Sequence, residues 1–120
     1  MGDLSEHFSR VEFACNCGCG FDTVDSGTLA VLEEVRQHFN ASVVINSGCR
    51  CANWNKQVGG EPNSYHMQAR AADIAVAGVP PSRVADFVEN GPLKGEGGVG
   101  RYNTFTHVDT RSNGPARWTG

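Results

Sequence analysis

The sequence predicts an α+β fold built on a small, mainly antiparallel sheet. Segments with helical and strand patterns follow one another in the order helix, strand, helix, strand, helix, strand, strand. Too few long crossover connections are present for a parallel, doubly wound sheet. The 120 residues contain no repeat, low-complexity segment or linker, so we expect a single domain over residues 1–120.

The first half of the chain is expected to form a helix, a strand and a second, short helix. Residues 25–39 carry apolar side chains at helical spacing, with Asp25 or Ser26 as a suitable N-cap. Residues 42–47 are short, β-branched and flanked by turn residues, which is typical of a buried strand. Residues 52–58 predict a short helix that ends before two glycines.

The second half is expected to add three strands and a helix. Residues 72–76 alternate in the manner of a strand. Residues 80–90 begin with proline and end before glycine, which suits a helix. Residues 97–102 and 105–111 predict two neighbouring strands, arranged as a hairpin around Asn103.

Composition and charge argue against several classes of partner. The formal net charge is −3 and no run of Lys or Arg occurs, so nucleic acid is not an expected partner. No apolar run approaches the roughly 20 residues of a membrane-spanning helix, so we expect no membrane association. The N-terminus lacks the charged-then-apolar pattern of a secretory signal, so we expect the protein to be made and kept in the cytoplasm.

Five cysteines occur in two tight groups. Cys15, Cys17 and Cys19 form C-x-C-x-C, and Cys49 and Cys51 form a second C-x-C. They fit reduced thiols in a reducing compartment, or a disulfide between the groups that forms after release from the cell. They also fit a structural zinc site, although one-residue spacing is tighter than the usual C-x₂₋₄-C. The odd number leaves one thiol free or paired between chains.

Two histidines and two aspartates form the set that points to chemistry. His66 lies in the loop before the strand that Asp73 would begin. His107 and Asp109 lie two residues apart on one predicted strand, so their side chains face the same way. Two imidazoles and a carboxylate are a familiar catalytic zinc set that leaves the fourth position for water. Spacing alone is suggestive of such a site.

Three segments resemble the zinc D-Ala-D-Ala carboxypeptidase family. "SYHMQARAAD" (64–73) resembles its S-x-H-x-x-G-x-A-x-D motif, and "GGVGRYNTFTHVDTR" (97–111) resembles the strand pair that carries its last zinc histidine. "INSGCRC" (45–51) resembles its S-G-x-R segment. The resemblance covers nearly the whole chain and is closest to small phage-type members and bacterial murein endopeptidases. It implies a small antiparallel sheet with flanking helices, the fold shared with the Hedgehog signalling domain.

The resemblance also implies roles for individual residues. His66, Asp73 and His107 resemble the three ligands of one zinc ion per chain. Arg50 resembles the arginine that steadies the substrate near the scissile bond. Ser64 matches the motif serine that lies beside the substrate carboxylate in relatives.

Two positions depart from the family pattern. Ala69 replaces the motif glycine, and a backbone with positive φ would tolerate alanine poorly. Thr104 stands where many relatives have an acid that serves as general base. Asp109 is therefore the first candidate for the catalytic base and Glu96 the second. In the alternative interpretation, Asp109 orients His107 or an arginine.

Two further patterns have simpler explanations. "GEGGVG" (95–100) fits G-x-G-x-x-G, but it is expected to follow a helix and open a strand, so we interpret it as glycine-rich backbone beside the cleft. Arg101, Arg111 and Arg117 are interpreted as solvated side chains; in the alternative interpretation they form a basic rim that meets the acidic groups of peptidoglycan stems.

The expected function is that of a monomeric zinc-dependent peptidase that hydrolyses peptide bonds in bacterial peptidoglycan stems or cross-links. A phage lysin released to the cell wall fits better than a periplasmic enzyme. D-Ala-D-Ala, L-Ala-D-Glu and diaminopimelate bonds are all cleaved within the family. Two alternatives stay open: a non-catalytic zinc-binding interaction module that lacks the base, and a virion tail component with this fold.

Overall fold

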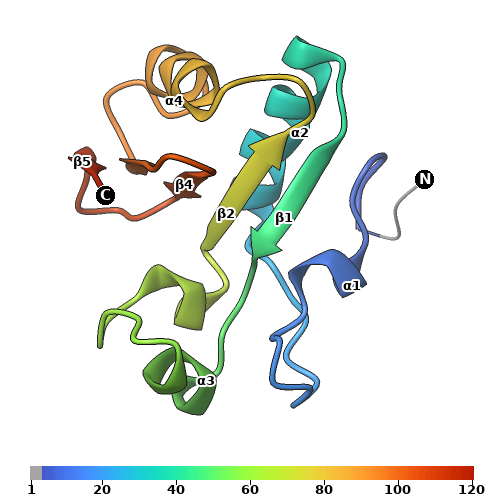
Figure 1. The fold of residues 1–120 in the computed structure, drawn as a ribbon, viewed down its shortest axis with the longest axis vertical. Coiled ribbons are helices and arrows are strands. Elements are labelled where there is room, and N and C mark those ends of the chain that lie inside the picture. The colour runs from blue at the N-terminus through green and yellow to red at the C-terminus, as the bar shows by residue number, and fades with distance from the viewer. Residues whose placement is uncertain (1–3) are drawn as a thin grey trace.

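A five-stranded sheet organises residues 4–120, the part of the chain that the computed structural model describes (Figure 1). Its strands are β1 (Val43–Ser47), β2 (Ala71–Val76), β3 (Gly98–Arg101), β4 (Thr106–Asp109) and β5 (Ala116–Thr119). They lie in the order β1-β2-β4-β3-β5. Neighbours are antiparallel except β3 and β5, which run parallel. The predicted α+β class with a mainly antiparallel sheet is confirmed.

Within the described residues, four α-helices and one 3₁₀-helix accompany the sheet. They are α1 (Arg10–Phe13), α2 (Ser26–Phe39), α3 (Ala52–Gln57), η1 (Tyr65–Gln68) and α4 (Pro81–Asn90). Helices α2 and α4 contact each other; α2 packs against β1 and β2, and α4 against β3 and β4. Helix α3 and η1 lie instead at the end of the sheet where β1 stops and β2 starts (Figure 1). No helix within residues 4–120 has the length and apolar character needed to cross a membrane.

The predicted helices and strands occur within a few residues of their expected limits. Helix α2 starts at Ser26 because the carboxylate of Asp25 accepts hydrogen bonds from the N–H groups of Gly27 and Thr28, at 3.0 and 3.3 Å. Helix α4 places Pro81 in its first turn, where the missing N–H is not needed. Helix α1, η1 and strand β5 were not predicted from the sequence, and each has only four residues.

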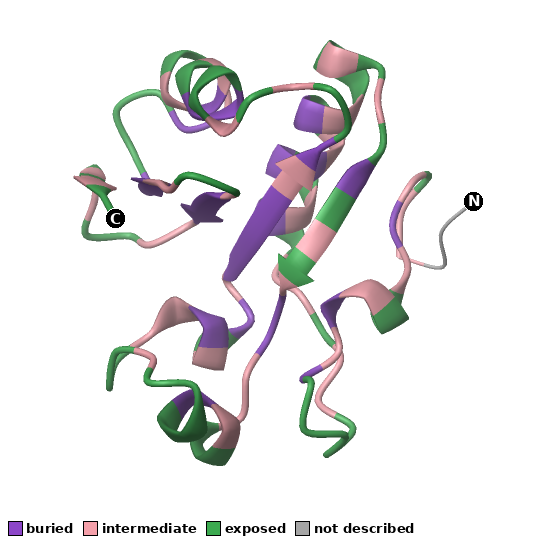
Figure 2. Cartoon of the chain, viewed as in Figure 1, coloured by how far each residue is buried: buried purple, intermediate pink, exposed green. Residues whose placement is uncertain are grey.

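The apolar core lies between the sheet and the two long helices. Leu32 and Val35 of α2 and Val88 of α4 are fully buried with Ile74 of β2 and Val99 of β3. Figure 2 shows β2 buried along most of its length. Each fully buried aliphatic side chain contributes roughly 1.5–3 kcal/mol, so the sheet is a well-supported platform.

The register of β2 and β4 determines which residues meet on the other face. Asp73 lies directly opposite His107, and Ala71 lies opposite Asp109. Side chains alternate along a strand, so the core residues Ile74 and Val108 point the other way. One face of the strand pair therefore faces the helices, and the other carries Asp73, His107 and Asp109.

Candidate active site

A cleft of about 900 Å³ opens beside this polar face of the sheet. His66, Asp73 and His107 lie in its lining. The surrounding wall is formed by the loop that precedes η1, by Arg50, and by residues of the β3–β4 turn and of β5. Segments that are far apart in the sequence therefore contribute to one cavity.

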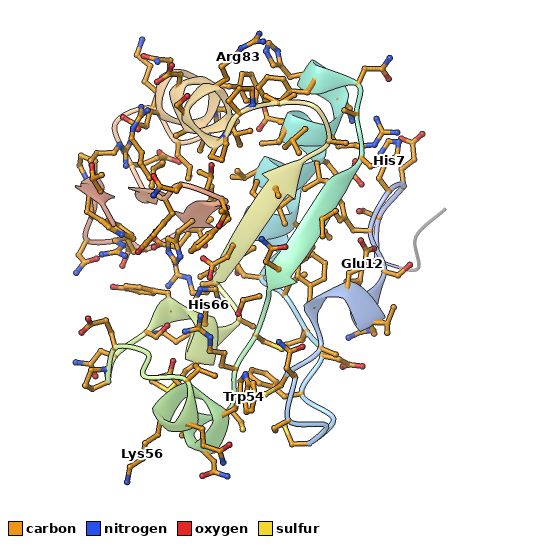
Figure 3. All side chains as sticks on the ribbon, viewed as in Figure 1. His7, Glu12, Trp54, Lys56, His66 and Arg83 are labelled. Atoms are coloured by element: carbon orange, nitrogen blue, oxygen red, sulfur yellow. The ribbon has the colours of Figure 1, made fainter. Side chains whose placement is uncertain are left out.

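The three residues expected to be zinc ligands converge in this cleft. Their candidate ligand atoms all lie within 4.8 Å of one another. Oδ1 of Asp73 lies 2.8 Å from Nδ1 of His107 and 3.3 Å from Nε2 of His66. All three side chains are buried. Figure 3 shows His66 close to the start of β2, because η1 leads directly into that strand.

Both imidazoles are oriented by a partner on the ring nitrogen that faces away from Asp73. Nδ1 of His66 lies 2.6 Å from the carbonyl oxygen of Gly48. A carbonyl only accepts, so Nδ1 carries a proton, and Nε2 is the ring nitrogen that faces Asp73. Nε2 of His107 lies 2.8 Å from Oδ2 of Asp109, which leaves Nδ1 to face the cleft centre. Such partners are typical of metal-binding histidines.

Asp109 lies behind His107 with no exposed surface. Besides contacting His107, its carboxylate accepts two side-chain hydrogen bonds from Arg111, at 2.9 and 2.7 Å, and one from the Arg111 N–H at 3.1 Å. Both carboxylate oxygens are therefore occupied. This position matches the orienting role that the sequence left open for Asp109.

Arg111 is the main residue of this site that the sequence analysis misread. Its side chain is 20% exposed, and its guanidinium lies over the rings of Tyr65 and Trp118, at 4.6 and 5.1 Å from their centroids. The interpretation as a solvated residue is wrong because the ion pair with Asp109 and the two rings hold the side chain in place. The i, i+2, i+4 spacing of His107, Asp109 and Arg111 was the available signal.

The glycines of β3 make room for this arrangement. A Cβ atom at Gly98 would overlap the carboxylate of Asp109, the residue paired with it across the strands. A Cβ atom at Gly100 would overlap the indole of Trp118 on β5. The glycine-rich segment thus follows α4 and opens a strand beside the cleft, as predicted.

Arg50 lies in the segment after β1, and its guanidinium is directed at the carboxylate of Asp73 in the cleft. Its Nη2 lies 3.5 Å from Oδ2 of Asp73. Nε donates to the hydroxyl of Ser47 at 3.3 Å, and Nη1 donates to the side-chain oxygen of Asn55 at 3.1 Å. The guanidinium is therefore held at the cleft wall. Ser47 and Asn55 were not singled out from the sequence.

Ser64 and Ala69 define the two ends of the turn that carries His66. The hydroxyl of Ser64 accepts a hydrogen bond from the His66 N–H at 3.2 Å and caps η1. Ala69 closes the turn with φ 57° and ψ 29°, the left-handed conformation expected for the motif glycine. An L-residue in this conformation costs roughly 1–2 kcal/mol, so the departure from glycine leaves the turn in place at some cost in stability.

Neither candidate for the base lines the cleft. Glu96 is exposed in the turn before β3, and Asp109 is enclosed behind His107. Thr104 is exposed in the β3–β4 turn. Within residues 4–120, the acids in the cleft lining are Asp73 and Glu61. Glu61 lies on the loop before η1 and was not identified from the sequence.

The hydrogen bonds at the site outweigh the effect of burial on its ionisable groups. Burial raises the pKa of Asp73, but hydrogen bonds from His107 and His66 hold that pKa well below its usual value. Burial is likewise outweighed at Asp109, where bonds from Arg111 and His107 lower the pKa. Burial lowers the pKa of His107, yet the bonds to Asp109 and Asp73 raise it overall. A metal ion bound by His107 would therefore compete with a proton for the ring nitrogen that faces the cleft.

Comparison with known proteins places the chain in a class of peptidases. Residues 6–109 match the family model described as Peptidase M15. The match covers most of the chain, so the chain belongs to the peptidase M15 family, and the predicted family resemblance is confirmed.

A relative in Haemophilus influenzae is named as a probable peptidoglycan L,D-endopeptidase, MepK. It is 40% identical over 89 residues, which cover 68% of this chain and 45% of the relative. The chain thus spans about half the length of the curated relative that it matches.

Proposed function

We propose that the chain is a zinc-dependent endopeptidase that hydrolyses an L,D peptide bond in peptidoglycan. The observation that carries this proposal is the convergence of His66, Asp73 and His107 in an open cleft. Membership of the peptidase M15 family and the name of the Haemophilus influenzae relative support the reaction and the substrate.

The three side chains fit a zinc ion. Two imidazole nitrogens and one carboxylate oxygen are a donor set of catalytic zinc sites, with one position left open. The Gly48 carbonyl holds a proton on Nδ1 of His66, so Nε2 is the ring nitrogen that can bind a metal ion. When bound, zinc would polarise the peptide carbonyl and lower the pKa of a water toward 7.

The chain's own groups would orient the substrate and the ligands. Arg50 offers N–H donors at the cleft wall, where they can hold a substrate carboxylate or a carbonyl oxygen that gains negative charge. The Ser64 hydroxyl caps the turn that holds His66 in the cleft. We assign Asp109 as a positioning residue, because its carboxylate fixes the ring of His107 and is itself fixed by Arg111.

Removing the guanidinium of Arg50 is expected to lower kcat/KM by about 10- to 150-fold, since a charge-assisted hydrogen bond is worth roughly 1.5–3 kcal/mol. The measurement compares Arg50→Ala and Arg50→Lys with the wild type, together with their metal content. We expect metal to be retained in both variants and Lys to restore only part of the rate, since it cannot reproduce the fork of donors. Wild-type kinetics in Arg50→Ala would rule out a role in substrate binding.

Mass spectrometry of muropeptides is the decisive test of the proposed function. Purified peptidoglycan is digested with the protein, with the protein treated with chelator, and with Asp73→Asn. We expect products of L,D cleavage only with the untreated wild type, and restored cleavage when zinc is returned. Cleavage confined to D,D bonds would contradict the assigned bond, and cleavage that resists complete metal removal would contradict the metal.

Asp109 and Glu96, the two candidates for the general base, do not line the cleft. This observation favours one alternative function, that of a non-catalytic module. A zinc-binding interaction module would retain the three ligands without hydrolysing any bond. Turbidity of a cell-wall suspension separates the two functions, because an endopeptidase clears the suspension in a chelator-sensitive manner and a module does not. The role as a phage lysin, with synthesis in the cytoplasm and release to the wall, stays a prediction, and recovery of the protein in purified phage particles would indicate a tail component.

A further inference from the structure

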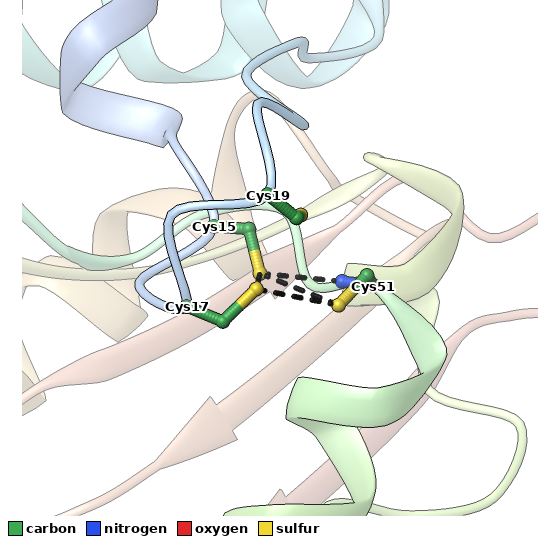
Figure 4. A group of neighbouring side chains, drawn as sticks. All are labelled: Cys15, Cys17, Cys19 and Cys51. Carbon is green, nitrogen blue, oxygen red and sulfur yellow. Dashed lines mark hydrogen bonds between the residues drawn. The ribbon is translucent and has the colours of Figure 1, made fainter.

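Four of the five cysteines form a cluster outside the candidate active site. Three of them lie in the loop after α1, and the fourth immediately precedes α3. The sulfur atoms of Cys15, Cys17, Cys19 and Cys51 all lie within 4.8 Å of one another. Cys15 lies 3.5 Å from Cys17 and 3.8 Å from Cys51, and Cys17 lies 3.6 Å from Cys51, measured between Sγ atoms. Figure 4 shows Cys15 and Cys17 facing Cys51 across a short gap.

These separations suit a single tetrahedral metal ion. Zinc–sulfur bonds of about 2.3 Å in a tetrahedron place the sulfurs roughly 3.8 Å apart. A disulfide would instead bring two sulfurs to about 2.05 Å and leave the other two unused. A cubane iron–sulfur cluster binds its four thiolates on four different irons and therefore spreads them farther apart.

The fifth cysteine, Cys49, makes its contacts away from the other four. This explains why the number of cysteines is odd, because one thiol lies outside the group. Cys49 is buried, and its Sγ lies 3.0 Å from the carbonyl oxygens of both Phe13 and Phe21, so its one thiol proton is directed at these two acceptors. Cys49 and Cys51 belong to one extended segment, where neighbours at i and i+2 would share a face in a regular strand. The chain turns into α3 at this point, so Cys51 faces the other three cysteines.

Backbone N–H groups already point at two of the sulfurs. The N–H of Cys51 donates to Sγ of Cys15, and the N–H of Trp54 donates to Sγ of Cys51, both at 3.4 Å. Hydrogen bonds of this kind orient and stabilise metal-bound thiolates. The four thiols therefore converge on one point, and backbone N–H groups hold two of their sulfur atoms in place, as in a protein metal site.

We propose that Cys15, Cys17, Cys19 and Cys51 bind one structural zinc ion, separate from the cleft that holds His66, Asp73 and His107. This ion would join the loop at residues 15–19 to the residue that follows Arg50. It would thereby fix the segment that supplies both the guanidinium at the cleft wall and the Gly48 carbonyl that orients His66. The inference does not depend on the proposed peptidase activity.

The metal content of matched cysteine variants tests the proposal. Protein purified under reducing conditions is analysed for zinc as wild type, Cys51→Ser, Cys17→Ser and Cys49→Ser. With the cleft also loaded, we expect about two equivalents in the wild type and in Cys49→Ser, and about one in the other two variants. His66→Ala should retain the cysteine-bound equivalent, which distinguishes the two sites. Equal zinc in Cys51→Ser and Cys49→Ser would overturn the proposal.

Cobalt substitution of the wild type gives a second measurement that does not require a variant to fold. Co²⁺ bound by thiolates shows an intense sulfur-to-metal charge-transfer absorption, whereas Co²⁺ bound by imidazole and carboxylate lacks it. We expect this absorption at about one Co²⁺ per chain, and its presence in His66→Ala. No thiolate absorption, mononuclear iron in place of zinc, or disulfides among the four cysteines in the reduced, freshly purified protein would overturn the proposal.

Discussion

Asp73→Ala is expected to lose the metal of the cleft and to lower peptidoglycan hydrolysis by at least about 10³-fold. A catalytic metal supplies several kcal/mol of transition-state stabilisation, and each 1.4 kcal/mol is a tenfold change in rate. Asp73 is the carboxylate that His66, His107 and Arg50 all approach, at 3.3, 2.8 and 3.5 Å. Its removal leaves these groups facing one another, so the variant should also melt at a lower temperature.

The measurement combines elemental analysis, activity and thermal unfolding. Asp73→Asn and His66→Ala accompany Asp73→Ala, because Asn keeps the size of the side chain while being a weaker ligand. Asp86→Ala is the control: this acid is 63% exposed, pairs with Arg101, and should leave metal and activity unchanged. Loss of about one equivalent of metal is expected in each cleft variant. Full metal occupancy in both Asp73→Ala and His66→Ala would refute the assignment of the ligands.

Asp109→Asn is expected to weaken metal binding by about 10- to 100-fold and to lose activity that added zinc partly restores. The amide would place N–H groups toward Arg111 and His107, both of which donate to the carboxylate in the wild type. A buried donor without an acceptor costs roughly 1–3 kcal/mol, so the ring of His107 should lose its fixed orientation.

The same variant distinguishes the positioning role from the general-base role predicted from the sequence. Loss of a base would leave the metal in place and lower the rate by about 10²–10⁴-fold, with no recovery on addition of zinc. Metal titration followed by steady-state kinetics at saturating zinc separates these outcomes. Glu96→Gln makes the same chemical change at an exposed acid and should behave as the wild type. A persistent rate defect at full metal occupancy would restore Asp109 as the base.

The elements that the sequence predicted well are those whose signals are local. The helix from Ser26 to Phe39 combines an apolar periodicity with a capping residue, so its start could be placed to within one residue, with Asp25 or Ser26 as the cap. The two strands that pair Asp73 with His107 were found because β-branched and alternating segments stand between turn residues. The motif around His66 located the metal candidates without reference to the fold.

The features that were missed depend on contacts between distant segments. Strand β5 has four residues and is recognisable only through its parallel pairing with β3. The enclosure of Asp109 requires Gly98 on the neighbouring strand and Arg111 beyond the strand end, and no local pattern encodes how deeply a carboxylate is buried. The division of the cysteines into four and one likewise needs the turn at α3 that separates Cys49 from Cys51.

The group around His107 has a simple charge balance with a consequence for the substrate. Asp73 and Asp109 remain ionised because their pKa values are held low, and their two negative charges are matched by Arg50 and Arg111. With neutral imidazoles, the protein therefore contributes no net charge to this group. A divalent cation bound there would keep its full double charge, inside a chain whose formal net charge is −3. Its field would attract anionic ligands from solution, so association of a carboxylate-bearing peptide should weaken as ionic strength rises.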